Sequence, residues 1–536
     1  MAVLGLGAFA ASVSLAQDIA AAGQNSTSTY FDENGAYFGP NCDSVNYTGA
    51  YYTGDYTSPF KTILGKTDAE IQAKLDQLWN HYFKGDGNSR VYYDDNGKQM
   101  GAFNQGEAYI FDTGSHDVRS EGMSYGMMIS VQTNHKEEFD KLWAWAKSHM
   151  WHKGGEWDGY FSWQIQPNGQ SDAKPAPDGE LYFMMSLLFA ANRWDDNQYM
   201  EDAQYILDRM WNNSSYKLFN EGNNIVTFQP TMGNKDFSDP SYDLPAFLEL
   251  FSRWSTTNQD KWKSALEATR NHLYVSSNGN TGLFTDYNNF DGTPHSGFSQ
   301  DNPSDTYMFD AMRCAMNFGM DYYLFGADAT RQTEMAKRII NFFKKDNYTH
   351  ARFTWDGQVV SNHSQDRYTL GEMGANAVAT YALMGEADYK DLVKENLEMA
   401  WNAQLATGDS RYYDGLVHYL AMLHLTGNFK IWKPKPEIKE KSVAAGEYNG
   451  TSHNEGDVIE SYEECQLYKV TFIKGNDNGG SENGGSENGG STDALRRMYA
   501  PSAVFKMQRD YDIRGCKVSG TNKARAAYYG KKVLVK

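Results

Sequence analysis

The densest group of residues able to do acid–base chemistry lies in the segment 112–128. It reads DTGSHDVRSEGMSYGMM and places Asp117, Arg119 and Glu121 where a helix is expected to begin. A carboxyl group at such a position can act as a general acid when protonated and as a general base when ionised. The alternative interpretation is that Glu121 only complements the helix dipole in the first turn.

Two further segments supply acids that could complete a pair. Asp178 lies in PAPDGELYF and Asp310 in FDAMR. The residues alone do not favour Asp310 over Asp301 or Asp305, and Asp305 is the better candidate for capping a helix. Asp310 is expected inside that helix, and Asp178 could itself be a helix cap.

Motifs of other hydrolytic and cofactor chemistries are missing from the sequence. It contains no serine-hydrolase elbow, HExxH pair, P-loop or CxxC pair. The loose GxGxxA match at 5–10 has no strand before it and no βαβ unit after it, so we reject it as a nucleotide loop. We expect no metal and no cofactor. Two carboxylates, one protonated and one ionised, are the common means of breaking glycosidic bonds.

Aromatic residues close to these acids fit a sugar ligand. Aromatics make up 14% of the chain, and Tyr and Trp offer flat faces with polar edges. The loop WDGYFSWQ lies between helical patterns and holds Trp157, Tyr160, Phe161 and Trp163. We predict that this loop stacks on sugar rings; burial in the core is the alternative.

The pattern of apolar residues predicts a helical domain that positions these side chains. Apolar residues recur at spacings of three and four in twelve stretches, which indicates amphipathic helices. Twelve helices in six pairs, joined by long and unlike loops at 152–178, 213–240 and 274–303, favour an all-α (α/α)6 barrel over a bundle or solenoid. The stretches are 67–83, 120–133, 136–149, 179–193, 197–211, 241–254, 258–273, 305–325, 330–346, 370–384, 388–403 and 410–425.

The two ends of the chain differ from the helical domain in amino-acid composition. Residues 1–16 read as a signal peptide, which predicts a secreted protein, and 17–47 as an extended lead-in. After the domain at 48–432 we expect a linker with short strands at 433–474, giving a small β-rich C-terminal appendage. A flexible Gly/Ser/Asn/Glu linker at 475–492 and a basic tail at 493–536 follow.

Charge and hydropathy exclude two classes of partner. The net charge of −19 argues against nucleic acid, and beyond the leader no apolar run is long enough to span a membrane. The tail carries eleven Lys or Arg against three Asp, a net +8. It resembles basic tails on secreted enzymes of fibre-degrading bacteria, which suggests attachment to the cell surface. Binding of acidic polysaccharide and a solvated module without a catalytic role are the alternatives.

Five collinear motifs resemble glycoside hydrolase family 8 over roughly residues 48–432. The first, DVRSEGMSYGMM, is similar to the family signature, and PAPDGELYFMMSLLFA to its second acidic motif. DPSYDLPAFLELFSRW resembles a substrate-cleft helix and FDAMR the helix of the general base. RYYDGLVHYLAMLHLTGNF is similar to the closing helix.

The resemblance implies a role for each matching residue. Glu121 would be the general acid, Asp310 the general base, and Asp178 the acid that helps distort the sugar at the cleavage point. The family inverts anomeric configuration. Tyr242 matches a cleft tyrosine, and Arg313 could hold Asp310 by charge. Arg119 would lower the pKa of Glu121 if they paired, so we expect Arg119 to point elsewhere.

The motifs look most like the xylan-active branch, which implies xylan or xylo-oligosaccharides as substrate. The exo-acting members close the cleft with a loop containing Leu-His-Pro-Ser after a His. Here the segment 359–379 has no such string; His363 either matches the His or is a surface loop residue. We therefore expect an endo-1,4-β-xylanase. The alternatives are a reducing-end xylose-releasing exo-oligoxylanase, a β-glucanase or cellulase of the family, and a non-catalytic carbohydrate-binding protein.

Overall fold

The computed structural model describes residues 30–41, 48–94, 99–297, 302–463 and 466–474. The chain divides into two units, 1–474 and 475–536, and all described residues lie in the first. The expected signal peptide, flexible linker and basic tail lie outside the described residues, as does most of the lead-in.

Six nearly fully buried helices form the inner ring of the fold. They are apolar around most of their circumference, as expected for helices without a solvent face. Each packs on the next in chain order, and the last packs on the first, which closes the ring. The inner helices are α5 (Ser120–Gln132), α7 (Pro177–Trp194), α9 (Pro245–Trp254), α11 (Arg313–Phe325), α13 (Leu370–Ala379) and α15 (Tyr413–Leu425).

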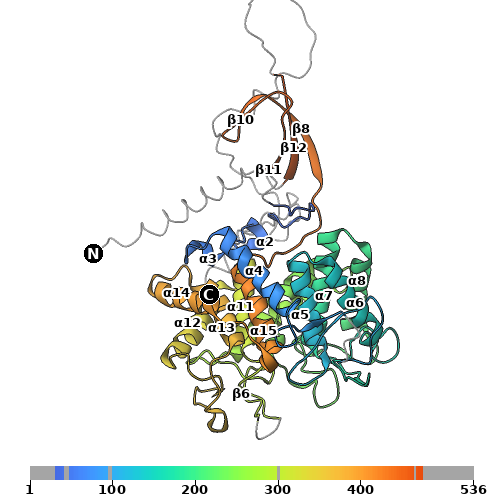
Figure 1. Ribbon diagram of the computed structural model, residues 1–536, viewed down its shortest axis with the longest axis vertical. Coiled ribbons are helices and arrows are strands. Elements are labelled where there is room, and N and C mark those ends of the chain that lie inside the picture. The colour runs from blue at the N-terminus through green and yellow to red at the C-terminus, as the bar shows by residue number, and fades with distance from the viewer. Residues whose placement is uncertain (1–29, 42–47, 95–98, 298–301, 464–465, 475–536) are drawn as a thin grey trace, which may run out of the picture. The chain divides into compact units, whose positions relative to one another are not determined.

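Six amphipathic helices cover the inner ring and alternate with it along the chain. On α12, for example, Met335, Ile339 and Phe343 recur at helical spacing on the buried side. The outer helices are α4 (Asp68–Tyr82), α6 (Lys136–His149), α8 (Asn197–Asn212), α10 (Gln259–Ser276), α12 (Ala329–Lys345) and α14 (Lys390–Asn402). The twelve predicted helices are thus present in the described residues, as an (α/α)6 barrel (Figure 1).

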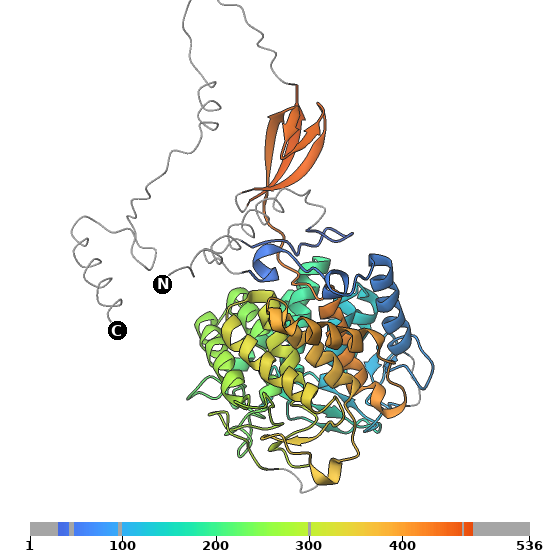
Figure 2. The same cartoon turned by 90° about the vertical axis from the view of Figure 1, so that its left-hand side faces the viewer.

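Alternation of inner and outer helices brings the N-terminal ends of the inner helices to one end of the barrel. The chain runs back along an outer helix before each new inner one, so all six inner helices point the same way. In Figures 1 and 2 the connecting loops gather at this end, around β6 (Thr306–Tyr307). Short antiparallel pairs order the loops: β1 (Tyr92–Tyr93) with β2 (Tyr109–Ile110), β3 (Val118–Arg119) with β4 (Gln164–Ile165), β4 with β5 (Ser171–Asp172), and β6 with β7 (Phe353–Thr354).

One predicted helix begins eight residues later than expected. The expected helix 305–325 starts at Arg313, because Thr306 and Tyr307 pair with β7 instead of forming a helical turn. Asp310 therefore lies in the loop before α11, not inside the helix, and the expected start at Ser304–Asp305 is wrong. By contrast, the predicted start of α4 is correct: Thr67 and Glu70 form a capping box.

The segments flanking the barrel are more ordered than the sequence suggested. Residues 30–41, expected as an extended lead-in, contact the barrel: the Phe38 ring lies 5.6 Å from that of Trp432, and Asp32 pairs with Arg193 at 3.0 Å. Short helices α2 (Ala50–Thr53) and α3 (Pro59–Thr62) follow.

No helix within the described ranges could cross a membrane.

The strands expected within residues 433–474 are present. Strand β12 (Gln466–Ile473) pairs antiparallel with β11 (Val458–Glu463) and parallel with β8 (Ile438–Ala444). Strands β9 (Gly446–Tyr448) and β10 (Thr451–His453) form a separate hairpin.

Glycine permits close contacts between inner helices, and this generates a prediction about stability. A Cβ atom at Gly319 would lie 2.5 Å from the carbonyl oxygen of Val378 on α13. Gly319→Ala should lower the free energy of unfolding by about 1–3 kcal/mol, because backbone cannot yield as a flexible side chain can. Urea unfolding measures the change.

Gly385→Ala is the matched control, since a Cβ there meets nothing within 4 Å. Its unfolding midpoint should stay near that of the wild type. Equal midpoints for the two variants would contradict the packing of α11 against α13.

Candidate active site

Acidic and basic side chains from separate inner helices meet at the loop-bearing end of the barrel. Glu121 and Asp178 are each the second residue of their helices, α5 and α7, and Arg313 is the first residue of α11. The N-terminus of a helix carries partial positive charge, which favours carboxylates. The fold therefore gathers acids where three helix ends converge.

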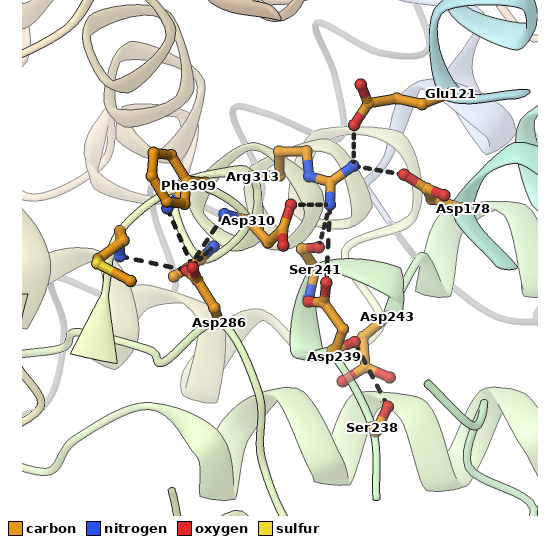
Figure 3. Close-up of polar contacts among 12 residues, drawn as sticks. Glu121, Asp178, Ser238, Asp239, Ser241, Asp243, Asp286, Phe309, Asp310 and Arg313 are labelled. Atoms are coloured by element: carbon orange, nitrogen blue, oxygen red, sulfur yellow. Dashed lines mark hydrogen bonds and ion pairs between the residues drawn. The ribbon is translucent and has the colours of Figure 1, made fainter. Parts of the chain in front are cut away.

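The guanidinium group of Arg313 links these acids (Figure 3). Its Nη1 donates to Asp178 Oδ2 at 2.6 Å and to Glu121 Oε2 at 3.1 Å. Its Nη2 donates to Asp310 Oδ1 at 2.9 Å and to the Ser241 hydroxyl at 2.7 Å. Glu121 and Asp310 thus bind different terminal nitrogens of Arg313, Nη1 and Nη2, and the guanidinium group lies between the two carboxyl groups.

Small residues let the carboxyl-bearing helix ends approach one another. A Cβ at Gly179, next to Asp178, would lie 2.6 Å from Ser120 Oγ, next to Glu121. A Cβ at Gly122 would collide with the Tyr412 ring. The glycine at position 122 therefore lets the Tyr412 ring approach the first turn of α5.

Tyr412 gives Glu121 a second partner. Its hydroxyl donates to Glu121 Oε1 at 3.0 Å, opposite the oxygen that binds Arg313. The Glu121 side chain is 15% exposed, so it is largely enclosed but not sealed from solvent.

The pKa values of the clustered acids are shifted upward. Burial raises the pKa of Glu121 to about 8; Arg313 opposes this rise, while the charges of Asp178 and Asp310 add to it. Burial also raises the pKa of Asp310, again opposed by Arg313. Burial and the charge of Asp310 raise the pKa of Asp239 well above its ordinary value. At neutral pH the cluster contains a protonated carboxyl at Glu121, as an acid catalyst requires.

Of the residues predicted from sequence, Glu121, Asp178, Asp310, Arg313 and Tyr242 come together. The Tyr242 ring centre lies 5.9 Å from Arg313 Cζ. Five partners of this group were not predicted from the sequence: Tyr125, whose hydroxyl accepts from Arg313 at 2.8 Å, Asp239, Ser241, Asp286 and Tyr412. All but Asp286 lie inside motifs quoted above, but no local pattern singles them out.

Arg119 pairs with Asp112 and Asp117 and not with Glu121, as expected, although its charge still lowers the pKa of Glu121. Its Nε lies 3.1 Å from both Asp112 and Asp117, and its Cζ lies 5.4 Å from the centre of the Trp163 ring. The carbonyl of Trp163 accepts the Ser120 N–H at 2.9 Å, which places this half-buried tryptophan beside the start of α5.

The loop WDGYFSWQ only partly behaves as predicted. Tyr160 and Phe161 are 0% exposed and pack in the core, so neither can stack on a sugar, and the prediction is wrong for both. Trp157 is half-buried, with one face stacked on Tyr216 at 4.1 Å. Helical periodicity separates core from surface; an irregular loop offers no such pattern, so burial could not be inferred there.

His363 lies in the 3₁₀ turn Ser361–His363, where its Nδ1 is 3.0 Å from Asp366 Oδ2. Its contact with substrate stays a prediction. Within the described ranges, no group of three or more His, Cys, Asp or Glu could hold a metal ion.

A helical barrel with paired carboxylates at the N-terminal ends of its inner helices defines an (α/α)6 glycoside hydrolase. The chain matches glycosyl hydrolases family 8 over residues 99–427 and belongs to that family, in its xylan-active branch.

Two curated relatives and one solved structure show the similarity. The "Reducing end xylose-releasing exo-oligoxylanase" of Halalkalibacterium halodurans is 36% identical over 406 residues, covering 73% of this chain and 98% of that protein. Rex8A of Paenibacillus barcinonensis, which bears the same activity name, is 37% identical over 412 residues, covering 72% and 98%. The structure of Rex8A complexed with xylose has a TM-score of 0.65 at 35% identity and covers 72% of this chain and 100% of that one.

The central cation generates a prediction that combines stability and pH. Arg313→Ala leaves buried carboxylates without a counter-charge, which should cost about 3–5 kcal/mol of unfolding free energy near neutral pH. A carboxyl whose folded pKa exceeds its unfolded value, as for Glu121, loses stability as pH rises. Because Arg313 opposes the rise in the pKa of Glu121, its loss should strengthen this pH dependence. The unfolding free energy of the variant should therefore lie further below that of the wild type at pH 8 than at pH 5, as measured by urea unfolding.

Arg331→Ala is the control, because Arg331 pairs with Asp328 near the surface of α12, where its side chain is 32% exposed. It should change stability little at either pH. A pH-independent loss in Arg313→Ala would show that its charge does not govern the acid cluster.

Proposed function

We propose that this protein is an inverting, reducing-end xylose-releasing exo-oligoxylanase, with Glu121 as general acid and Asp310 as general base. The observation that carries the proposal is the joint placement of Glu121 and Asp310 on Arg313 in a chain whose relatives bear that activity name. The relatives favour this alternative over the endo-xylanase first expected from the sequence.

Glu121 suits the acid role because its carboxyl is protonated at neutral pH. Burial and neighbouring charge hold its pKa at about 8, so the proton is available to the glycosidic oxygen as the bond to the anomeric carbon breaks. Tyr412 and Arg313 each bind one oxygen of the carboxyl, and these bonds also stabilise the carboxylate left after proton transfer.

Asp310 suits the base role because Arg313 opposes the effect of burial on its pKa and occupies Oδ1. Its side chain is 29% exposed, more than that of Glu121. In the proposed reaction it accepts a proton from water while the water oxygen attacks the anomeric carbon from the face opposite the leaving group. Inversion follows from this single displacement.

Three further predicted residues, Asp178, Tyr242 and Trp163, are proposed to bind the sugar. Asp178, which shares Nη1 of Arg313 with Glu121, would take the hydroxyls at the cleavage point and help distort the ring. Tyr242 lies against the same guanidinium. Trp163, with Arg119 over its ring, offers an aromatic surface beside Glu121.

A non-catalytic carbohydrate-binding protein is the competing class. Such a protein would not need a protonated acid and a separately held carboxylate on one cation. The co-location of Glu121, Asp178 and Asp310 therefore favours an enzyme.

We also propose secretion through residues 1–16 and surface attachment through the basic tail, both on sequence grounds. Cell fractionation of full-length protein and of a form lacking 493–536 tests them: loss of the tail should release the enzyme into the medium.

Product analysis distinguishes exo from endo action. On linear xylo-oligosaccharides we expect xylose and a product one unit shorter, with negligible release from polymeric xylan. Labelling the reducing end should place the label in the released xylose. Chromatography of early products makes the measurement.

A ladder of mixed xylo-oligomers from polymeric xylan would contradict exo action and support an endo-xylanase. The experiment is needed because the segment 359–379 lacks the Leu-His-Pro-Ser string of the exo-acting members, although the relatives favour exo action. Cleavage of only a β-glucan or chitosan would contradict the proposed substrate class, but not the proposed roles of Glu121 and Asp310.

The proposed roles predict the pH dependence of activity. Since Glu121 must be protonated, kcat/KM should decline as pH rises through about 8. Glu121→Gln should lower kcat by roughly 10²–10⁴-fold and remove that alkaline decline. Steady-state rates between pH 4 and 10 measure both effects.

Glu137→Gln, on the outer helix α6, is the control and should keep the wild-type profile; its side chain is 76% exposed. An alkaline decline that persists in Glu121→Gln would assign it to another group.

A further inference from the structure

A buried carboxylate outside the proposed acid–base pair lies beneath the Asp310 loop (Figure 3). Asp286 is 4% exposed and accepts four consecutive backbone N–H groups. Its Oδ1 takes those of Met308 and Asp310 at 3.2 Å and of Ala311 at 3.0 Å, and its Oδ2 takes that of Phe309 at 3.2 Å.

These four N–H groups precede α11, and local residues do not satisfy them. Helix starts are usually capped by a side chain directly before the helix. Here the capping position is Met312, which makes no side-chain cap bond. The carboxylate that binds the segment comes from a loop 24 residues before Asp310.

Other contacts hold the neighbours of Asp310 and not its own N–H. Tyr413 donates to the carbonyl of Phe309 at 2.8 Å, and Arg352 lies 4.1 Å from the centre of the Phe309 ring. Asp286 is itself tied in place, since its N–H donates to the Thr306 carbonyl on β6 at 3.0 Å. Asp286 thus binds the N–H groups of Asp310 and of both its neighbours, and the other backbone bond of Asp310 is from the Arg313 N–H to its carbonyl at 3.1 Å.

We propose that Asp286 is a positioning residue that holds the Asp310 backbone so that its carboxylate binds Arg313 and faces the attacking water. The inference rests on the role of Asp310 under the proposed function. Asp286 takes no part in proton transfer. Its effect on the reaction passes through Asp310, because small displacements of a catalytic group are costly.

Asp286→Asn in the full-length chain tests this role. An amide keeps the volume but replaces one acceptor oxygen by a donor, so at least one N–H bond is lost. We expect kcat to fall by roughly 10–100-fold on whichever substrate the wild type cleaves, with KM within about twofold. Xylotriose binding should stay near wild type, and the lost N–H bond should lower the unfolding midpoint without unfolding the protein at the assay temperature.

Asp346→Asn is the matched control. Asp346 also accepts consecutive backbone N–H groups, those of Thr349 and His350 at 2.8 Å, at the end of α12. The same chemical change there should leave kcat unaltered. If Asp286→Asn does not fold, Asp286→Glu keeps the carboxyl group but moves it by one methylene, and should give a smaller kcat loss.

A double-mutant cycle separates positioning from general damage. In an Asp310→Asn background, Asp286→Asn should not lower the residual activity further, because the group that it positions is already gone. An additional loss in that background, a rise in KM with constant kcat, or wild-type kcat in Asp286→Asn would each overturn the proposal. Full activity of Asp310→Asn alone would instead overturn the proposed function.

Discussion

The buried guanidinium of Arg313 is the interaction on which the catalytic end of the barrel depends. It is 3% exposed and contacts carboxylates carried by α5, by α7 and by the loop before α11, together with a hydroxyl before α9. Charges attract strongly where water is excluded, but a buried charge without a partner is costly. One cation therefore both collects the acids and makes their burial tolerable.

A shortage of positive charge in this cluster explains how its acids differ in protonation. Several carboxyl groups share one central arginine, so not all can ionise together. The pKa of Glu121 rises to about 8 and that of Asp239 is also raised well above its ordinary value, while Arg313 limits the rise at Asp310. Environments that separate the pKa values of neighbouring acids are the physical basis of acid–base division of labour.

Backbone proximity is the second constraint on the site. The carboxyl groups converge because their helices meet at glycines: Gly179 lies against Ser120, and Gly122 lies against Tyr412. The loops then add a finer adjustment, since Asp286 and the pairing of β6 with β7 direct Asp310 from outside the helices. The helical scaffold places the site coarsely, and the loop contacts orient its groups.

The sequence by itself determined the twelve helices and the acids at the starts of α5 and α7, because helical periodicity and first-turn acids are local patterns. The assignment of Asp310 came from family resemblance, and its place before α11 was decided by β6–β7 pairing and by Asp286. Tyr160 proved to be buried, and Tyr412 reached Glu121 across 291 residues. Only the tertiary structure could decide these points, since contacts between distant segments leave no periodic trace in either segment alone.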